Sequence, residues 1–112
     1  MKVWGVGIFD NDVAQDVRRD FEAALAAGQS VYIAADLLLQ KYDQSNSCAL
    51  YLALAALQLE HELIQPKIKK KALTLIISGD AEEDWTASGP AIYENRKAVL
   101  SELRAKLVAM PT

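Results

Sequence analysis

Apolar side chains recur at helical spacing in the first third of the chain. One face of a helix is formed by positions three and four apart, and the following residues fit it: Val13, Ala14, Val17, Phe21, Ala24 and Leu25. Asp10, Asn11 or Asp12 can cap the start of such a helix by accepting a backbone N–H, and Gly28 is typical of its end. The pattern therefore predicts a helix from about residue 10–12 to Gly28.

A second apolar stretch begins after Ser30, which is a suitable N-cap, and extends to Tyr42. Its spacing predicts a helix over 30–42, although the β-branched and aromatic residues at 31–33 also suit a strand. Between helix and strand, the start of this element stays open. The polar residues 43–47 that follow predict a loop.

Residues 48–63 form a third element that is apolar nearly all round as far as Leu59. A surface helix has one polar face, whereas a helix covered by neighbours on several sides does not. We therefore expect this helix at the centre of the fold. Its polar end comprises Gln58 and residues 60–62.

Two further helices are predicted, over 66–79 and 91–108, because Pro66 suits a first turn and Pro111 ends the last run. Residues 80–85 have the spacing of one short helical turn. Together the pattern predicts one all-α domain over 1–112. We expect a compact bundle of about five helices around the central apolar helix, with an extended N-terminal arm over residues 1–9.

Composition excludes several classes of protein. With 52% hydrophobic and 24% charged residues the chain is typical of a globular domain, and its net charge of -3 favours no nucleic-acid partner. The single cysteine, Cys48, excludes an intrachain disulfide and a cysteine zinc site. The longest apolar run, 48–57, is about half of a membrane span, and the N-terminus lacks a signal-peptide pattern. We expect a cytoplasmic protein that uses neither membrane nor cofactor.

Residues 4–14 read Trp-Gly-Val-Gly-Ile-Phe-Asp-Asn-Asp-Val-Ala. They resemble the opening of a group of uncharacterised bacterial proteins, the DUF4259-like group, whose members typically begin Trp-Gly-x-Gly-x-Phe-Asp-Asn-Asp-x-Ala. Residues 52–58, 69–79 and 96–107 also resemble one branch of that group, which usually has Trp at the position of Leu59 and Gly-Arg-Leu at 62–64. The resemblance implies no established activity, and some members of the wider set resemble immunity or stress-related proteins.

Acidic residues form the first candidate site. Asp12, Asp16 and Asp20 lie four residues apart on one helix face, with Asp10 and Asn11 at its head. Such oxygen-rich faces bind Mg²⁺ or Ca²⁺, and paired carboxylates perform acid–base chemistry. A solvated face that suits the positive end of the helix dipole is the favoured interpretation, because metal ligands must converge from several elements.

The loop of Trp4, Gly5, Gly7 and Phe9 is the second candidate site. Gly-x-Gly binds phosphate when a strand precedes it, and none is predicted here. The favoured interpretation is an arm that plugs the bundle with two aromatic side chains. The alternative is a recognition loop, since tryptophan commonly anchors interfaces.

Three other sets of polar residues are better explained without chemistry. Residues 60–62, Glu-His-Glu, point in different directions on a helix, and the only histidine, His61, has no identifiable partner for catalysis. The four lysines within 67–71 predict a solvated face, with an acidic protein partner as the next choice. Cys48 is expected to pack in the core.

These patterns favour a non-catalytic protein-interaction module with no catalytic residue and no metal site, either immunity-like, as the resemblance implies, or regulatory. Its candidate binding residues are Trp4, Gly5, Gly7, Phe9, Asp10, Asn11, Asp12 and Asp16. The expected partner is another protein. A small-ligand or divalent-cation-dependent enzyme that uses Asp10, Asp12 and Asp16 is the alternative, and a homodimer stays open.

Overall fold

The structure is a computed structural model that describes residues 5, 7–42, 47–78 and 90–110. These described residues form no strand. They form the helices α1 (Asp12–Ala26), α2 (Val31–Lys41), α3 (Ser47–Glu60), α4 (Pro66–Ser78) and α5 (Pro90–Ala109). The all-α prediction is therefore confirmed. Of the other expectations, Gly79, the helical turn at 80–85 and Pro111 lie outside the described residues.

Helix α1 begins and ends as the sequence predicts. Asn11 is its N-cap, with extended backbone and a side chain that accepts the N–H of Ala14. At the other end Gly28 has a φ of 95°, a left-handed conformation that glycine adopts without steric cost. The N–H groups of Gly28 and Gln29 then donate to carbonyl groups in the last turn of α1. This arrangement is a Schellman motif, and it turns the chain toward α2.

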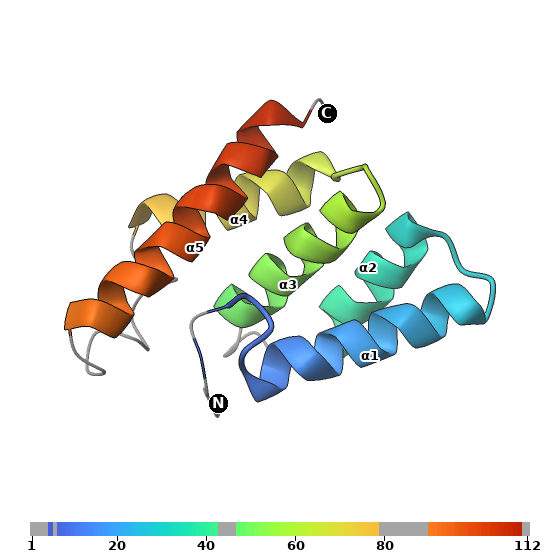
Figure 1. Cartoon of the computed structure of the whole chain (residues 1–112). Coiled ribbons are helices and arrows are strands. Elements are labelled where there is room, and N and C mark those ends of the chain that lie inside the picture. The colour runs from blue at the N-terminus through green and yellow to red at the C-terminus, as the bar shows by residue number, and fades with distance from the viewer. Residues whose placement is uncertain (1–4, 6, 43–46, 79–89, 111–112) are drawn as a thin grey trace.

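The stretch that suited either a helix or a strand is helical. Ser30 caps α2, because its Oγ accepts the N–H of Ile33 at 3.1 Å. Ala34, Ala35 and Leu38 are buried between α2 and its neighbours. Consecutive helices α1 and α2 run in opposite directions (Figure 1).

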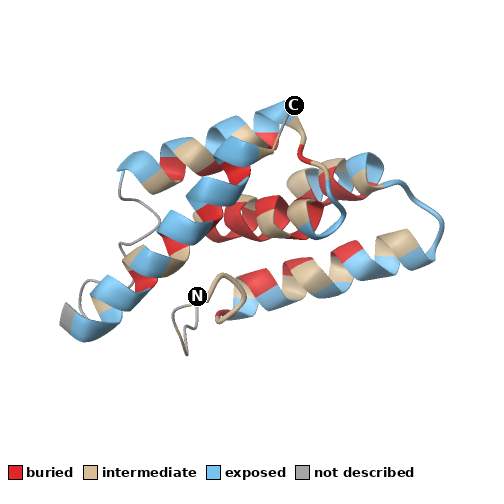
Figure 2. Cartoon of the chain, turned by 45° about the horizontal axis from the view of Figure 1, so that its top comes forward, coloured by how far each residue is buried: buried red, intermediate tan, exposed pale blue. Residues whose placement is uncertain are grey.

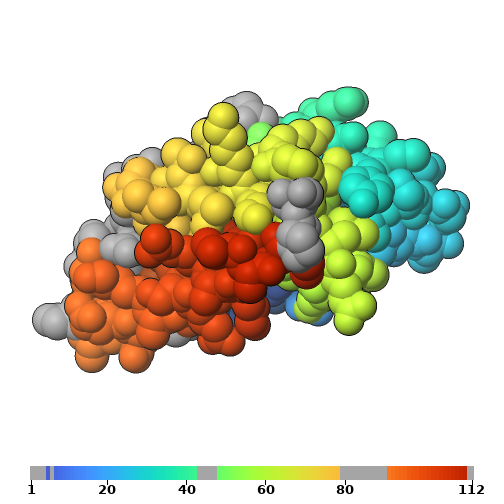
Figure 3. Space-filling view, turned by 90° about the horizontal axis from the view of Figure 1, so that it is seen from above, coloured from blue at the N-terminus to red at the C-terminus, as the bar shows by residue number. Residues whose placement is uncertain are grey.

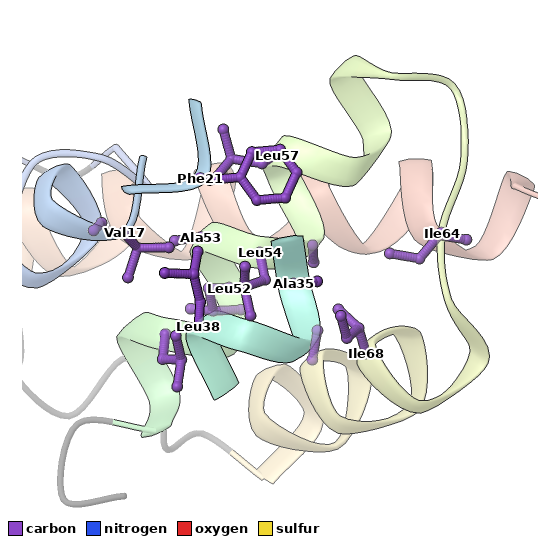
Figure 4. Close-up of a cluster of buried hydrophobic side chains, with 14 of the residues drawn as sticks. Val17, Phe21, Ala35, Leu38, Leu52, Ala53, Leu54, Leu57, Ile64 and Ile68 are labelled. Atoms are coloured by element: carbon purple, nitrogen blue, oxygen red, sulfur yellow. The ribbon is translucent and has the colours of Figure 1, made fainter. Parts of the chain in front are cut away.

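Helix α3 contacts each of the four other described helices. Buried residues follow one another along most of its length, whereas α1, α4 and α5 keep exposed outer faces (Figure 2). Figure 4 shows how the side chains of several helices meet there. Those from α3 are Leu52, Ala53, Leu54 and Leu57, and those from its neighbours are Val17, Phe21, Ala35, Leu38 and Ile68.

Helix α3 ends at Glu60, three residues before the predicted end at residue 63. The prediction was wrong here because Glu62 adopts a left-handed φ of 58°. The N–H groups of Glu62 and Leu63 donate back to Leu59 and Gln58, so a second Schellman motif closes the helix without a glycine. The buried side chain of Gln58 then accepts the N–H of Gln65 at 2.9 Å and joins α3 to the start of α4.

Helices α4 and α5 lie side by side (Figure 3), and both contact α3. Pro66 starts α4 as predicted, and Ile68, Ala72 and Leu75 form its buried face. Lys69 donates to the carbonyl group of Met110 at 2.9 Å, a contact that stabilises the negative end of α5. No helix of the described ranges has the length and apolar character needed to cross a bilayer.

Candidate functional site

The described residues of the N-terminal arm form a tight turn that ends at the first turn of α1. The N–H of Asp10 donates to the carbonyl group of Gly7 at 3.1 Å, and the N–H of Gly7 donates to Oδ2 of Asp10 at 2.9 Å. Asp10 therefore uses both its backbone and its side chain to close the turn. Trp4, the first candidate residue of the arm, lies outside the described residues.

Both glycines of the motif lie against the Asp10 carboxylate, so a side chain at either position would displace that carboxylate from the Gly7 N–H. A Cβ at Gly5 would lie 2.5 Å from Oδ2 of Asp10, and a Cβ at Gly7 would lie 2.8 Å from the same atom. Real Cβ atoms do not approach so closely. Gly5, Gly7 and Asp10 are thus explained by the packing of the turn itself, without a ligand.

Asn11 is buried, with 1% of its surface exposed, and its side chain bonds both to the first turn of α1 and to the residues before it. Its Oδ1 accepts the N–H of Ala14 at 2.7 Å, and its Nδ2 donates to the carbonyl group of Ile8 at 3.3 Å. The side chain of Gln15 similarly donates to the carbonyl group of Phe9 at 2.8 Å. The backbone of Ile8 and Phe9 is therefore held from α1, which fixes where their side chains lie.

The acidic residues do not converge on one point. Asp12 is exposed and accepts the N–H of Val13, while Asp16 pairs with Arg19 at 3.1 Å. Within the described part of the chain, no three histidine, cysteine or acidic side chains come close enough together to hold a metal ion. The aspartates at 10, 12 and 16 lie in separate environments.

Asp20, the last acid of the stripe, joins α1 to α2. Its Oδ2 accepts hydrogen bonds from Lys41 Nζ at 2.8 Å and from the Tyr42 hydroxyl at 2.7 Å. These bonds stabilise the carboxylate and lower the pKa of Asp20 to about 2. Burial and the neighbouring carboxylate raise the pKa of Tyr42, so its hydroxyl stays protonated as the donor. The arrangement stabilises the α1–α2 contact.

An apolar groove of about 460 Å³ lies where the N-terminal turn, α3 and α5 meet. It is lined by six apolar residues: Ile8, Phe9, Ala56, Leu59, Val99 and Leu103. Glu60 from α3, with Glu102 and Lys106 from α5, forms its polar rim. Most of the apolar lining is only partly buried, so the groove is accessible to solvent.

Charged side chains around this groove are paired with one another. Glu60 accepts from Arg18 at 3.2 Å, and Glu102 lies 3.3 Å from Lys106. The Arg18 guanidinium also stacks over the ring of Phe9, 4.7 Å from its centroid. Arg18 therefore contacts two lining residues of the groove, one apolar and one acidic.

The remaining polar candidates lie apart from the groove or serve the fold. His61 follows the end of α3 and its ring lies 6.0 Å from that of Phe21, while Cys48 is half-buried against the core. The lysines of α4 are spread around the helix rather than gathered in a patch. Lys67 pairs with Asp36, Lys69 reaches α5, and Lys71 lies over the ring of Tyr51.

The sequence pointed to the N-terminal side of the groove, but the lining residues from α3 and α5 were not predicted. Phe9 was a candidate, but the lining residues of α3 and α5 read as ordinary positions of helix faces, and only the fold brings them beside the N-terminal turn. Gln58, expected at the polar end of its helix, is buried, and the buried Arg96 was missed, although a glutamine or arginine within an apolar helical stripe is a usable signal. Comparisons with protein-family models, curated proteins and solved structures give no match.

Proposed function

We propose that this protein is a non-catalytic interaction module that binds an apolar side chain from a segment of another protein. The single observation that carries the proposal is the groove between the N-terminal turn, α3 and α5. Exposed apolar surface rimmed by charge is typical of sites that dock another protein. A binder of this kind fits an immunity-like or regulatory role.

The lining supports binding rather than chemistry. Its floor consists of aliphatic and aromatic side chains, and its rim carboxylates each lie within salt-bridge distance of a cation. General acid–base catalysis needs a positioned group whose pKa suits proton transfer at the working pH. The rim carboxylates instead serve as ion-pair partners, Glu60 of Arg18 and Glu102 of Lys106.

Selection of binding peptides tests this proposal. Random linear peptides displayed on phage are panned on the immobilised full chain, and selected sequences are measured against Ala56→Phe. Ala56 lines the groove, so a phenyl group there fills the space that an anchor side chain needs. We expect peptides that bind the natural chain and lose roughly tenfold or more of their affinity for Ala56→Phe.

Ala98→Phe is the matched control, because Ala98 is exposed on α5 and does not line the groove. Leu59→Gln is a second groove variant that adds no bulk, and thermal unfolding establishes that each variant folds. Selected peptides that bind every variant equally, or a selection that yields none, would overturn the proposal. So would a dimer that dissociates in Ala56→Phe, because a second copy would then fill the groove.

A further inference from the structure

The edge of the groove already holds a cation of this chain. Arg18 lies 3.2 Å from Glu60, and its guanidinium covers one face of the Phe9 ring. Guanidinium groups bind such a combination of carboxylate and aromatic face both by charge and by stacking. The contact shows that a cationic group fits between the Glu60 carboxylate and the Phe9 ring.

Arg18 is shared between two carboxylates. Besides Glu60 it pairs with Glu22, also at 3.2 Å, so the local charge stays negative. Glu60 belongs to the last turn of α3, where the negative end of the helix dipole adds to the same sign. A second carboxylate, Glu102, lines the groove on α5 but is paired with Lys106, so the excess of negative charge lies at Glu60 and Glu22. The edge near Glu60 therefore favours a positively charged group.

The existing pair is easily exchanged. The side chains of Arg18 and Glu60 are 37% and 49% exposed, and ion pairs at such exposure contribute little to stability. When an apolar segment enters the groove it displaces water, which strengthens charge interactions at the edge. If Arg18 leaves Glu60 it keeps its pair with Glu22, so a cation delivered by the partner gives each of the two carboxylates a partner of its own.

We propose that the partner segment carries an arginine or lysine beside its apolar anchor, and that this cation pairs with Glu60 in place of Arg18. The inference rests on the proposed function, since it names the charge of the segment that the groove binds. It predicts a partner whose docking segment is both apolar and basic, complementary to the rim.

A double-mutant cycle tests the inference with the peptide actually selected above. The basic residue of that peptide is changed to glutamine, and both peptides are measured against the natural chain and Glu60→Gln. We expect the two changes to be non-additive, with a coupling of roughly fivefold in affinity that decreases as salt is added. Glu94→Gln makes the same change of charge away from the groove and should show no coupling.

The outcomes separate this inference from the proposal on which it rests. Groove-dependent peptides without a basic residue, or additive effects in the cycle with Glu60→Gln, would overturn the inference and leave the docking groove in place. Coupling to Glu102→Gln alone would also overturn the assignment to Glu60. Failure to select any groove-dependent peptide would overturn the proposed function itself.

Discussion

Replacing Asn11 with alanine removes the side chain that connects the N-terminal turn to α1. The Ala14 N–H, buried and 2.7 Å from Oδ1, would lose its acceptor, and the carbonyl group of Ile8 would lose a donor. Replacing a good N-cap with alanine costs about 1 kcal/mol, and the loss of the separate hydrogen bond from Nδ2 to Ile8 adds about 1 kcal/mol more. We expect Asn11→Ala to lower the free energy of unfolding by about 2 kcal/mol.

Urea denaturation followed by circular dichroism measures this change directly. The midpoint should fall while the slope stays constant, because the same surface is exposed on unfolding. For a chain of 112 residues, 2 kcal/mol corresponds to a fall in Tm of roughly 8 °C. Asn11→Ser keeps a good capping oxygen and should lose about half as much or less.

Asp12→Ala is the decisive control, because by sequence alone Asp12 is as good a cap as Asn11. Its side chain is exposed and accepts the N–H of Val13. We expect a loss of about 0.5 kcal/mol, the order of a charge near a helix N-terminus. If Asp12→Ala costs as much as Asn11→Ala, or if Asn11→Ala costs less than about 0.5 kcal/mol, the assignment of the cap is refuted.

Three further predictions follow from the helix ends and from the α1–α2 link. Glu62→Gly should raise stability by about 0.5–1 kcal/mol in urea denaturation, because its left-handed φ of 58° suits glycine, whereas Glu62→Ala should give no gain. Gln58→Ala should cost about 2–3 kcal/mol in the same assay, because it removes two hydrogen bonds and leaves the Gln65 N–H unpaired; Gln65→Ala, which keeps that bond, should cost about half as much. Asp20→Asn should destabilise the protein by about 1–2 kcal/mol at pH 6. Since the pKa of Asp20 is lowered to about 2 in the folded chain, its contribution is complete above about pH 4 and is lost as the pH falls toward 2. Chemical denaturation of both proteins across this range measures the difference, and a constant difference from pH 2 to pH 6 would contradict the role of the carboxylate.

Local signals were sufficient to predict the helices. Gly28 and Ser30 mark the end of α1 and the start of α2 through their own backbone chemistry, and the apolar stretch after Cys48 is helical as its pattern predicts. The end of α3 was missed because Glu62 adopts the left-handed conformation that glycine usually takes at a helix end. Just before this end, the buried side chain of Gln58 holds the link to α4, and a contact of this kind leaves no periodic signal.

The candidate site was predicted less well, because it is formed by residues distant in sequence. Phe9, Leu59 and Val99 come from three separate elements, and each has the apolar character of any residue on a helix face or in an arm. The acids at 12 and 16 were prominent in the sequence, yet in the structure they serve the start of α1 or pair with Arg19. Residue type identified the charged positions, but only packing determines which of them face a groove.

The motif that begins at Gly5 and ends at Asp12 contains some residues that fold the turn and others that line the groove. Gly5, Gly7 and Asp10 are explained by the closure of the turn, and Asn11 by the cap of α1. Ile8 and Phe9 have a different role, because their side chains line the groove. Variants of the glycines or of Asn11 should therefore weaken binding only as far as they unfold the turn. Substitutions at Ile8, Phe9 or Leu59 should weaken binding while most of the stability is kept. Loss of binding without loss of stability would therefore identify the residues that contact the partner, and loss of both would identify the residues that fold the turn.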